Sequence, residues 1–369
     1  MTTIARLPYD GFNGNSDGLL FKDIEWDYII IDEASMIPLA QVVYAIYRFP
    51  TSEIIIAGDP KQITPIVREH EWKDENIYKM VGLNNFANPV TEPIQFRVEN
   101  LSTQYRSVPA IGEVFSRYSY GGKLIHARTA DSARKLDIKG FEFMKALNFI
   151  TFKVDKYDNV CGPKKLSSSN VHIYSVLLVV EMCTYMARQY AKGKNRDVLR
   201  IGVICPYAAQ AQMIDKLLEQ TPDLPECVEI SVGTIHGFQG DQCDVVFAVF
   251  NPPKGLGKAP DRVMINNHNV VNVAISRARD YLFVVMPQKD APDFLKMEAL
   301  LTVGRIAIEG KDHPAMVNAD GIEEIIFKEK GFIERNTFVT SHQMANVYSK
   351  PASRYEVRID ENSVDIQIE

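Results

Sequence analysis

Two adjacent carboxylates that follow an apolar run are the first residues here whose types and spacing could do chemistry. Asp32 and Glu33 come directly after Tyr28–Ile31, in the stretch YIIIDEASMIPLA. A buried parallel strand would deliver both carboxylates to the end of a sheet, where a metal-bound nucleotide is commonly held. Acidic residues at a strand end also cap the following helix, and that alternative stays open for this stretch alone.

A nucleotide site of this kind usually has a phosphate-binding pattern, G-x-x-x-x-G-K-[ST], upstream of its carboxylates, and these 369 residues do not contain it. Gly-Lys pairs occur at 122–123, 193–194, 257–258 and 310–311, and neither Ser nor Thr follows any of them. About 31 residues precede Asp32, too few for a complete strand–loop–helix unit and the strands after it. Either the chain is a piece of a larger protein, or the nucleotide interpretation is wrong.

Further polar residues lie at the ends of other apolar runs. The run EIIIAG continues into GDPKQITP, where Gly58 permits a tight turn and a close approach of backbone, and Gln62 can hold a water or a phosphate oxygen. In LSTQYRSVPAI, Arg106 can reach a phosphate with its planar fork, and Tyr105 offers a face for a base. The alternatives are a simple turn with an exposed Gln and a surface Arg in a salt bridge.

Two later segments combine a glycine-rich loop with one strand and a pair of arginines with the next. They are VGTIHGFQGDQCDVVFAVF at 232–250 and VVNVAISRARDYLFVV at 270–285. Arg277 and Arg279 are predicted to lie on a helix before the second strand, where residues two apart do not share a face. One of them can therefore point to a nucleotide while the other supports the fold.

Short Val/Ile-rich runs that alternate with helical patterns predict an α/β fold for the elements that position these residues. The predicted strands are residues 27–32, 53–58, 201–206, 243–250 and 281–286. The predicted helices are residues 38–49, 109–118 and 207–220. Beyond them, EEIIFKEKGFI predicts a short helix that ends at Gly331, and RYEVRIDENSVDIQIE predicts a terminal β-hairpin.

Composition limits the class of protein. A length of 369 residues, with 46% hydrophobic and 24% charged residues, is typical of a globular chain of two domains. The net charge of −6 argues against a strongly basic nucleic-acid binder but allows a local basic cleft. The five widely spaced cysteines have no zinc spacing and fit reduced thiols inside a cell. Glu181 interrupts the most apolar run, 171–180, so no membrane span is expected.

Taken in order, six segments resemble motifs II to VI of superfamily 1 helicases, in the branch of the nonsense-mediated-decay RNA helicase and its DNA-helicase relatives. These segments are DEAS, GDPKQITP, LSTQYR, IGVICPYAAQ, TIHGFQGDQCDVV and NVAISRAR. The resemblance covers about residues 1–286. It implies an α/β fold of RecA-like P-loop NTPase helicase domains with parallel sheets. Residues 1–97 would be the C-terminal part of the first domain, without its P-loop, and residues 98–290 the second domain, followed by a small mixed α+β extension with the terminal β-hairpin at 291–369.

The opening TTIARL resembles a segment that this family places after its phosphate loop. The resemblance therefore implies that the chain is the C-terminal portion of a helicase. Its missing P-loop segment would lie upstream in cis or be supplied in trans by another polypeptide.

The resemblance also implies the chemical role of five residues. ATP would bind between the two domains, with Asp32 holding Mg²⁺ and Glu33 activating the attacking water. Gln62 would sense the γ-phosphate. Arg106 and Arg277 would stabilise charge on the phosphoryl group as it is transferred.

Three further residues would complete the nucleotide site. Tyr105 would stack on the adenine, and Gly240 and Gln242 lie in the segment that resembles motif V. The family usually has Glu at position 242, where it binds the ribose hydroxyls. Gln242 can still form hydrogen bonds there but lacks the charge, so the fine nucleotide preference stays open.

Single-stranded DNA or RNA is the implied partner, contacted with little sequence preference. ATP-driven closure of the cleft would move the protein along one strand, in the 5′ to 3′ direction usual for this branch. His236 is equally well explained as a structural loop residue. The residues implied to contact the strand are Thr3, Ser35, Pro206, Tyr207, Thr234 and His236.

Three hypotheses of function follow: the C-terminal portion of an ATP-dependent helicase, a nucleic-acid-binding module that does not turn over ATP, and one chain of a two-chain enzyme. Because ATP phosphates depend on the loop's amides and Lys, this chain alone is expected to hydrolyse ATP weakly or not at all. It is expected to be intracellular, in the cytoplasm or the nucleus, without a membrane partner. Residues 287–369 are expected to contact a protein partner or to complete a sheet edge.

Overall fold

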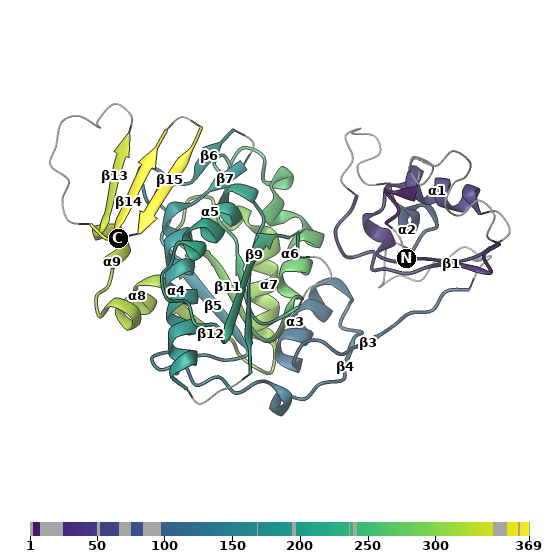
Figure 1. The fold of residues 1–369 in the computed structure, drawn as a ribbon, viewed down its shortest axis with the longest axis horizontal. Helices are drawn as coiled ribbons and strands as arrows, with labels where there is room; N and C mark the ends of the chain where they lie inside the picture. The colour runs from purple at the N-terminus through teal and green to yellow at the C-terminus, as the bar shows by residue number, and fades with distance from the viewer. Residues whose placement is uncertain are drawn as a thin grey trace. The chain divides into compact units, whose positions relative to one another are not determined.

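A computed structural model of the chain divides into two units, Met1–Glu99 and Asn100–Glu369 (Figure 1). The structure describes residues 3–7, 25–49, 52–65, 75–83, 97–167, 169–193, 197–235, 237–238, 242–341, 353–360 and 362–368. Within these ranges, no helix is long and apolar enough to cross a membrane. The domain boundaries that the sequence predicts, after residues 97 and 290, stay predictions.

Unit 1 contains a parallel pair of strands joined by a helix. Strands β1 (Tyr28–Ile31) and β2 (Glu53–Ile56) pair in register, so that Ile31 lies beside Ile56. Helix α1 (Leu39–Arg48) connects them, after the 3-10 turn η2 (Ala34–Met36). Helix α2 (Ile77–Met80) packs against η2. Two predicted strands therefore end side by side, as neighbouring parallel strands should.

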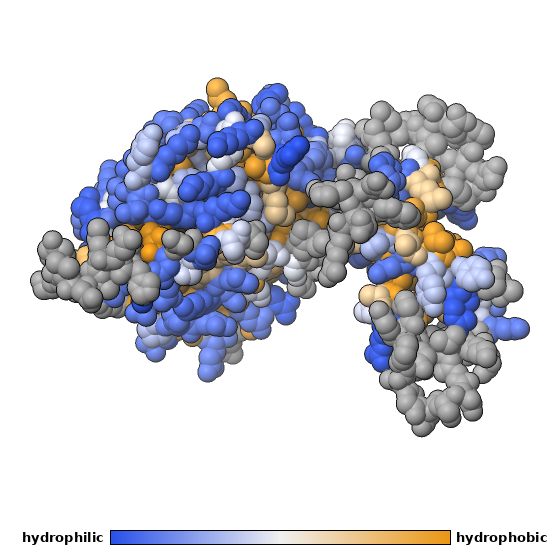
Figure 2. All heavy atoms as spheres, turned by 90° about the horizontal axis from the view of Figure 1, so that it is seen from above, coloured by the Kyte–Doolittle hydropathy of each residue, from blue (hydrophilic) through white to orange (hydrophobic). Residues whose placement is uncertain are grey.

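The two faces of this strand pair differ, because successive side chains of a strand point to opposite sides. On one face, Ile29 and Ile31 pack in a core with Val42 and Ala45 of α1. On the other face, Ile30 is 67% and Ile55 is 47% exposed. Hydrophobic side chains also gather on the visible surface of this unit in Figure 2.

Unit 2 contains a six-stranded parallel sheet in the order β12-β5-β11-β10-β8-β9. The strands β8, β10 and β11 correspond to three predicted runs, and nearly every residue of β10 is buried. This arrangement confirms the predicted α/β fold, and it is consistent with a RecA-like helicase domain. The six strands are β5 (Leu147–Phe152), β8 (Leu199–Cys205), β9 (Val228–Thr234), β10 (Cys243–Val249), β11 (Ala278–Pro287) and β12 (Ala315–Asn318).

Two groups of helices pack on this sheet, and Figure 1 shows the sheet between them. A parallel sheet needs cover on both faces because its strands are apolar on both sides. The first group is α4 (Ile173–Lys192), α5 (Ala208–Glu219), α8 (Ala319–Phe327) and α9 (Phe332–Arg335), and the second is α3 (Pro109–Ser119), α6 (His268–Ile275) and α7 (Glu298–Glu309). Most of the apolar run 171–180 forms the first part of α4, and the run is buried.

Short elements connect these layers. The strands β3 and β4 pair in parallel, and β6 and β7 form a small antiparallel pair. Their bounds are β3 (Thr103–Gln104), β4 (Ile125–His126), β6 (Lys164–Leu166) and β7 (Ser169–Val171), and the 3-10 turns are η4 (Ala130–Ser132), η5 (Pro260–Arg262), η6 (Met264–Asn266) and η7 (Phe294–Lys296).

The C-terminal segment forms a separate three-stranded sheet, β13-β14-β15. Strands β14 (Tyr355–Ile359) and β15 (Val364–Ile368) form the antiparallel hairpin that the sequence predicts, and β13 (Thr337–Ser341) pairs in parallel with β14. Glu181 of α4 holds this sheet in place, since its Oε1 accepts hydrogen bonds from Arg354 Nη2 (2.7 Å) and the Tyr355 hydroxyl (2.9 Å).

The predicted end of the helix at Gly331 is wrong. Helix α8 ends at Phe327, and Lys328 takes the left-handed conformation (φ 64°) that closes it. Gly331 (φ 63°) instead precedes α9. The earlier turn allows Ile333 of α9 to reach the core, where it is fully buried.

Candidate functional site

Asp32 and Glu33 lie at the carboxyl end of β1, directly beside the loop that follows β2. The amide of Ala34 donates to the carbonyl of Ala57 (3.0 Å), which fixes the two loops to each other. Glu33 has a left-handed backbone (φ 53°), and its amide donates to Asp32 Oδ1 (2.8 Å). The structure thus places both carboxylates at the strand end that the sequence predicts.

Gly58 allows these two loops to approach closely. It has φ +148°, and a Cβ atom there would lie 2.8 Å from the amide nitrogen of Ala34 and 2.9 Å from the Tyr78 hydroxyl. Both distances are shorter than real Cβ contacts, so glycine is required. The close approach predicted for Gly58 is confirmed.

Gln62 lies on the same loop and bonds to an acidic residue that the sequence analysis did not single out. Its Nε2 donates to Asp59 Oδ2 (3.3 Å), and the amide of Lys61 donates to Asp59 Oδ1 (2.8 Å). Asp59 therefore brings a third carboxylate to this edge. The Gly-Asp-Pro turn was visible in the sequence, and an acidic residue next to a required glycine was the signal for it.

Tyr78 of α2 is a second residue that the sequence did not reveal. Burial, followed by the negative charges of Asp59, Glu33 and Asp32, raises the pKa of Tyr78 to about 12. No local pattern marks this residue, because its role depends on the packing of α2 against η2. The phenol keeps its proton at neutral pH beside three carboxylates.

These carboxylates fit a hydrated cation better than a fully protein-bound one. Among the described residues, no three His, Cys, Asp or Glu side chains form a ready set of metal ligands. Mg²⁺ usually keeps several waters and binds proteins through one or two carboxylates, so it does not need such a set. Asp32, with Glu33 and Asp59 near the same strand ends, fits that mode of binding.

In unit 2, Arg106 lies on the loop between β3 and α3, and this loop is bonded to the start of β11. Arg106 Nη1 donates to the carbonyl of Ser276 (3.0 Å), and Ser107 Oγ donates to the carbonyl of Ala278 (2.6 Å). The amide of Val108 donates to the carbonyl of Arg279 (2.9 Å). Segments that are 170 residues apart in sequence are thus joined at one place.

The predicted helical position of Arg277 and Arg279 is wrong. Helix α6 ends at Ile275, Arg277 follows it with 1% exposure, and Arg279 is already part of β11. The strand begins this early because Ala278 pairs with Cys243 of β10. Arg277 therefore comes immediately before β11, next to the carbonyl of Ser276 that Arg106 contacts.

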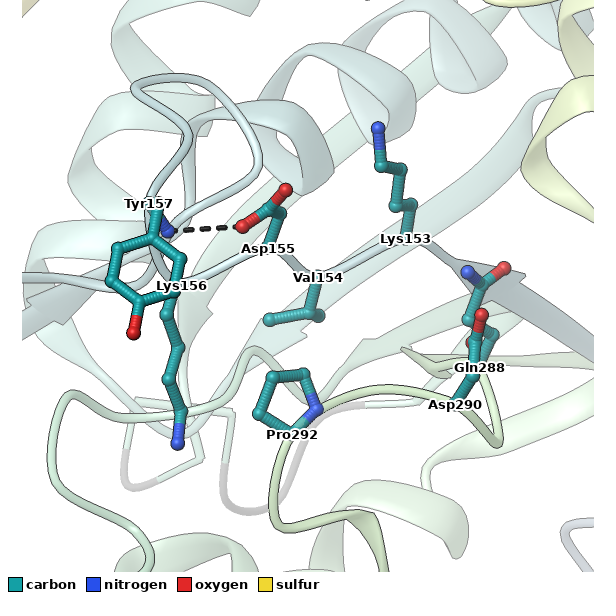
Figure 3. Close-up of a pocket in the computed structure, with 8 residues that line it drawn as sticks. All are labelled: Lys153, Val154, Asp155, Lys156, Tyr157, Gln288, Asp290 and Pro292. Atoms are coloured by element: carbon teal, nitrogen blue, oxygen red, sulfur yellow. Dashed lines mark hydrogen bonds between the residues drawn. The ribbon is translucent and has the colours of Figure 1, made fainter.

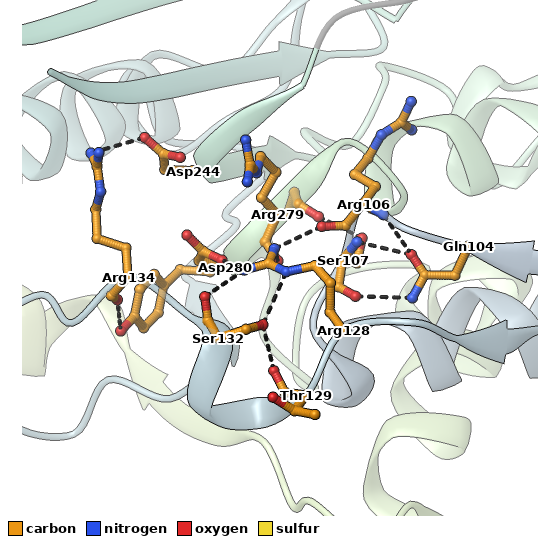
Figure 4. Close-up of polar contacts among 12 residues, drawn as sticks. Gln104, Arg106, Ser107, Arg128, Thr129, Ser132, Arg134, Asp244, Arg279 and Asp280 are labelled. Carbon is orange, nitrogen blue, oxygen red and sulfur yellow. Dashed lines mark hydrogen bonds and ion pairs between the residues drawn. The ribbon is translucent and has the colours of Figure 1, made fainter. Parts of the chain in front are cut away.

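Two residues that the sequence did not single out hold the Arg106 loop (Figure 4). Gln104 Oε1 accepts from the amides of Arg106 (3.0 Å) and Ser107 (2.9 Å). Arg128 Nη1 donates to the carbonyls of Arg106 (2.7 Å) and Arg279 (3.1 Å), and its Nη2 pairs with Asp280 Oδ1 (2.6 Å). Gln104 was visible as part of LSTQYR, whereas Arg128 belongs to no motif.

The remaining predicted residues of unit 2 lie at two opposite edges of its sheet, because all six strands are parallel. Gln242 immediately precedes β10, and Arg277 precedes β11, so both lie at the amino ends of strands. Pro206 and Tyr207 follow β8, and Thr234 ends β9, at the carboxyl ends. Asp32, Glu33 and Gln62 thus follow strands of unit 1, whereas Gln242 and Arg277 precede strands of unit 2.

The predicted contact residues differ in their exposure. Tyr105 is 75% exposed, whereas Tyr207 is 7% exposed and burial raises its pKa. In unit 1, Thr3 is exposed, and Ser35, directly after Glu33 and Ala34, is 1% exposed. The predicted residues His236 and Gly240 lie outside the described residues.

A hollow of about 430 Å³ lies at the carboxyl ends of β5 and β11 and was not predicted (Figure 3). Tyr157 is 97% exposed there. Lys153 pairs with Glu334 (3.2 Å), and Lys156 pairs with Asp293 (3.1 Å). Exposed pairs of this kind contribute about 0–1 kcal/mol, so both lysines can exchange partners. The lining residues are Lys153, Val154, Asp155, Lys156, Tyr157, Gln288, Asp290 and Pro292.

The sequence of this chain is similar to a known family model and to several helicases. A family model described as an AAA domain matches residues 85–289. The 5'-3' DNA helicase ZGRF1 of Mus musculus is 24% identical over 266 residues, which are 72% of this chain and 13% of that protein. DNA polymerase alpha-associated DNA helicase A of Saccharomyces cerevisiae is 24% identical over 275 residues, 70% of this chain and 38% of that protein.

Two further proteins similar to this chain are also named as helicases. The putative helicase mov-10-B.2 of Danio rerio is 25% identical over 286 residues, 72% of this chain and 28% of that protein. The crystal structure of the PRRSV nsp10 helicase shares 17% identity, with a TM-score of 0.19, over 71% of this chain and 36% of that one. The chain thus spans between 13% and 38% of the length of these three curated relatives.

Proposed function

The chain belongs to the AAA domain family, in a helicase-like branch of superfamily 1, and from this we propose that it couples ATP hydrolysis to movement along single-stranded nucleic acid. At the level of the family it is a helicase-type enzyme. The observation that carries the proposal is the shared edge of β1 and β2, which brings Asp32, Glu33 and Gln62 together. The direction proposed is 5′ to 3′, the direction in the name of one relative, the 5'-3' DNA helicase ZGRF1.

In unit 1, the carboxylates would act on water and metal. A Mg²⁺ ion would supply positive charge to the phosphates. Asp32 would hold that ion, and Glu33 would orient the attacking water and accept its proton. Gln62 would bind the terminal phosphate or this water, since its amide both donates and accepts hydrogen bonds.

In unit 2, the amino-terminal edge of the sheet would bind the nucleotide. Arg106 and Arg277 would stabilise the charge that develops on the transferred phosphoryl group. Tyr105 is exposed and would stack on the base. Gly240 and Gln242 would contact the ribose side of the nucleotide.

The carboxyl-terminal edge of the same sheet would bind the nucleic-acid strand. Pro206 and Tyr207 are buried, so their contribution would be to hold the backbone at the end of β8 in a shape that the strand can contact. The exposed ring of Tyr157 and the lysines around it are a further place for bases and phosphates. Thr234, the last residue of β9, would contact the strand at this edge as well. The remaining proposed contacts are Thr3 and Ser35 of unit 1 and His236, which lies outside the described residues.

A second candidate is a module that binds nucleic acid without turning over ATP, or one chain of a two-chain enzyme. The observation in its favour is that G-x-x-x-x-G-K-[ST] does not occur in these 369 residues. ATP phosphates depend on that loop in proteins of this class. In the two-chain form, another polypeptide would supply the loop.

The experiment that separates these candidates is ATP turnover by the full chain, with and without single-stranded DNA or RNA. Glu33→Gln removes the proposed base, and Glu53→Gln is the matched control, since Glu53 is exposed at the opposite end of β2. Turnover that nucleic acid stimulates, that Glu33→Gln abolishes and that Glu53→Gln leaves unchanged supports the enzyme. Strand binding without turnover supports the second candidate, and equal turnover in both variants contradicts the role of Glu33.

A further inference from the structure

The side-chain amide of Gln104 holds the loop that carries Arg106, and each of its hydrogen-bonding positions is used. Its Oε1 accepts from the amides of Arg106 (3.0 Å) and Ser107 (2.9 Å), and its Nε2 donates to the carbonyl of Ser107 (2.9 Å) (Figure 4). The same Nε2 lies 2.9 Å from His126 Nδ1. A glutamine amide has two donor hydrogens and an oxygen that can accept twice, so this set of bonds is complete.

The roles of the two atoms in the contact between Gln104 and His126 follow from these bonds. Because Oε1 of Gln104 faces two donors and its Nε2 faces a carbonyl, the amide fits in one orientation only. His126 Nδ1 must therefore accept, and the proton of the imidazole is on Nε2. Glu113 favours this tautomer: its Oε2 lies 3.6 Å from His126 Nε2, which is long for a hydrogen bond but close enough for its charge to attract the N–H group.

The fold brings Gln104 and His126 together from two short strands. Gln104 of β3 pairs with His126 of β4, and the amide of Ala127 donates to the carbonyl of Gln104 (2.9 Å). Gly112 of α3 leaves the space for this contact, since a Cβ atom there would lie 2.6 Å from His126 Nδ1 and 2.8 Å from Gln104 Nε2. The side chain of His126 is only 15% exposed, so a donor that lost its acceptor here would be poorly compensated by water.

We infer that His126 is a positioning residue for Arg106 and acts through Gln104. With Nδ1 as acceptor, the amide of Gln104 keeps the orientation that binds the backbone of Arg106 and Ser107. Without it, one hydrogen of Nε2 is left unmet in that orientation, and rotation of the amide away from it releases both backbone amides. The guanidinium of Arg106, which reaches the carbonyl of Ser276 (3.0 Å), would then be held less precisely. The inference rests on the proposed role of Arg106 at the transferred phosphoryl group.

Hydrogen exchange of the full chain without nucleotide, followed by mass spectrometry, tests this contact directly. The variants are His126→Leu and His126→Asn, because Leu and Asn have the same shape and only Asn has an acceptor oxygen where His126 has Nδ1. His126→Leu is expected to speed exchange of the Arg106 and Ser107 amides about fivefold or more, the value of one ordinary hydrogen bond. His126→Asn is expected to keep both amides near the wild-type rate. Equal exchange in the two variants overturns the inference.

Two further variants complete this experiment. Ile125→Leu is the matched control, at the neighbouring position of β4, where the side chain is 60% exposed, and it is expected to leave the exchange of both amides unchanged. Gly112→Ala forces His126 and Gln104 apart without changing either side chain, so it is expected to speed exchange of the same amides. Unchanged exchange in Gly112→Ala also overturns the inference, and this variant decides the question if His126→Leu does not fold.

The second measurement is kcat for ATP in the presence of single-stranded DNA or RNA. His126→Leu is expected to lower kcat about tenfold or more, since misplacing a catalytic group by ~1 Å can cost about a hundredfold in rate. His126→Asn is expected to restore most of the loss. Equal kcat in the two variants overturns the role of His126 in positioning Arg106. A wild type without turnover contradicts the proposed enzyme instead, and the exchange rates then decide whether His126 holds Gln104.

Discussion

Replacing Arg128 by alanine is expected to destabilise unit 2 strongly, because this side chain joins three parts of the fold. It donates to the carbonyls of Arg106 and Arg279 and forms an ion pair of 2.6 Å with Asp280 (Figure 4). It also donates to the carbonyl of Ser132 (2.8 Å). The side chain of Arg128 is 13% exposed and that of Asp280 is 4% exposed, so the pair is largely removed from water.

The size of the effect follows from what the substitution leaves behind. Arg128→Ala keeps the charge of Asp280 buried but removes its partner, and such a loss typically costs about 3–5 kcal/mol. That is a large part of the ~5–15 kcal/mol by which a domain is stable. Removing both charges together, in Arg128→Ala with Asp280→Ala, should cost less than the sum of the single variants, by about 1–3 kcal/mol.

The assay is urea unfolding of the full chain, followed by far-ultraviolet circular dichroism. Arg200→Ala is the control, because Arg200 pairs with Glu229 on the same sheet at 63% and 59% exposure. Exposed pairs contribute at most about 1 kcal/mol. If Arg128→Ala costs no more than Arg200→Ala, or if the two single variants of the buried pair are simply additive, the reasoning about the buried charge fails.

Two further outcomes are expected. Glu323 accepts a hydrogen bond from the Tyr174 hydroxyl, and burial raises the pKa of its carboxyl group above the ordinary 4.5. Its contribution to stability is therefore complete below pH 4.5 and is lost as the pH rises through the raised pKa. In melting curves recorded across pH, Glu323→Gln should flatten this loss. Gly112→Ala places a Cβ atom 2.6 Å from His126 Nδ1 and 2.8 Å from Gln104 Nε2. Urea unfolding should therefore show a free energy of unfolding lower by about 1–3 kcal/mol. An unchanged free energy of unfolding would contradict this close packing around Gly112.

The strands, and the positions of Asp32, Glu33 and Gly58 after them, were predictable because they depend on local sequence. A run such as IGVICP is apolar on both faces, which is what a central parallel strand needs, and it forms most of β8. Asp32 and Glu33 follow β1 directly, so their position requires only the strand to be found. Gly58 was predictable for a similar reason, since a tight turn after a strand favours glycine.

The arrangement around Arg128 was not predictable in this way. Asp280 is 152 residues from Arg128 in sequence, and the pair is formed by the fold. The start of β11 was misplaced for the same reason: its first residues include Arg279 and Asp280, which do not read as a strand. Local strand propensity does not place these two residues in the sheet. They are held there by Arg128, which bonds to the Arg279 carbonyl and pairs with the Asp280 carboxylate.

The opposite edges of the sheet in unit 2 have a consequence for coupling. Strand β10 has seven residues, which span about 23 Å at ~3.3 Å each, and it pairs with β8 on one side and β11 on the other. Such a buried, close-packed sheet has low compressibility. A displacement imposed on Arg277 would therefore, under the proposed function, be passed to the carboxyl ends of the strands rather than absorbed between them. Under the proposed function, ATP binding would move unit 2 as one rigid body, and the change of shape would fall in the loops.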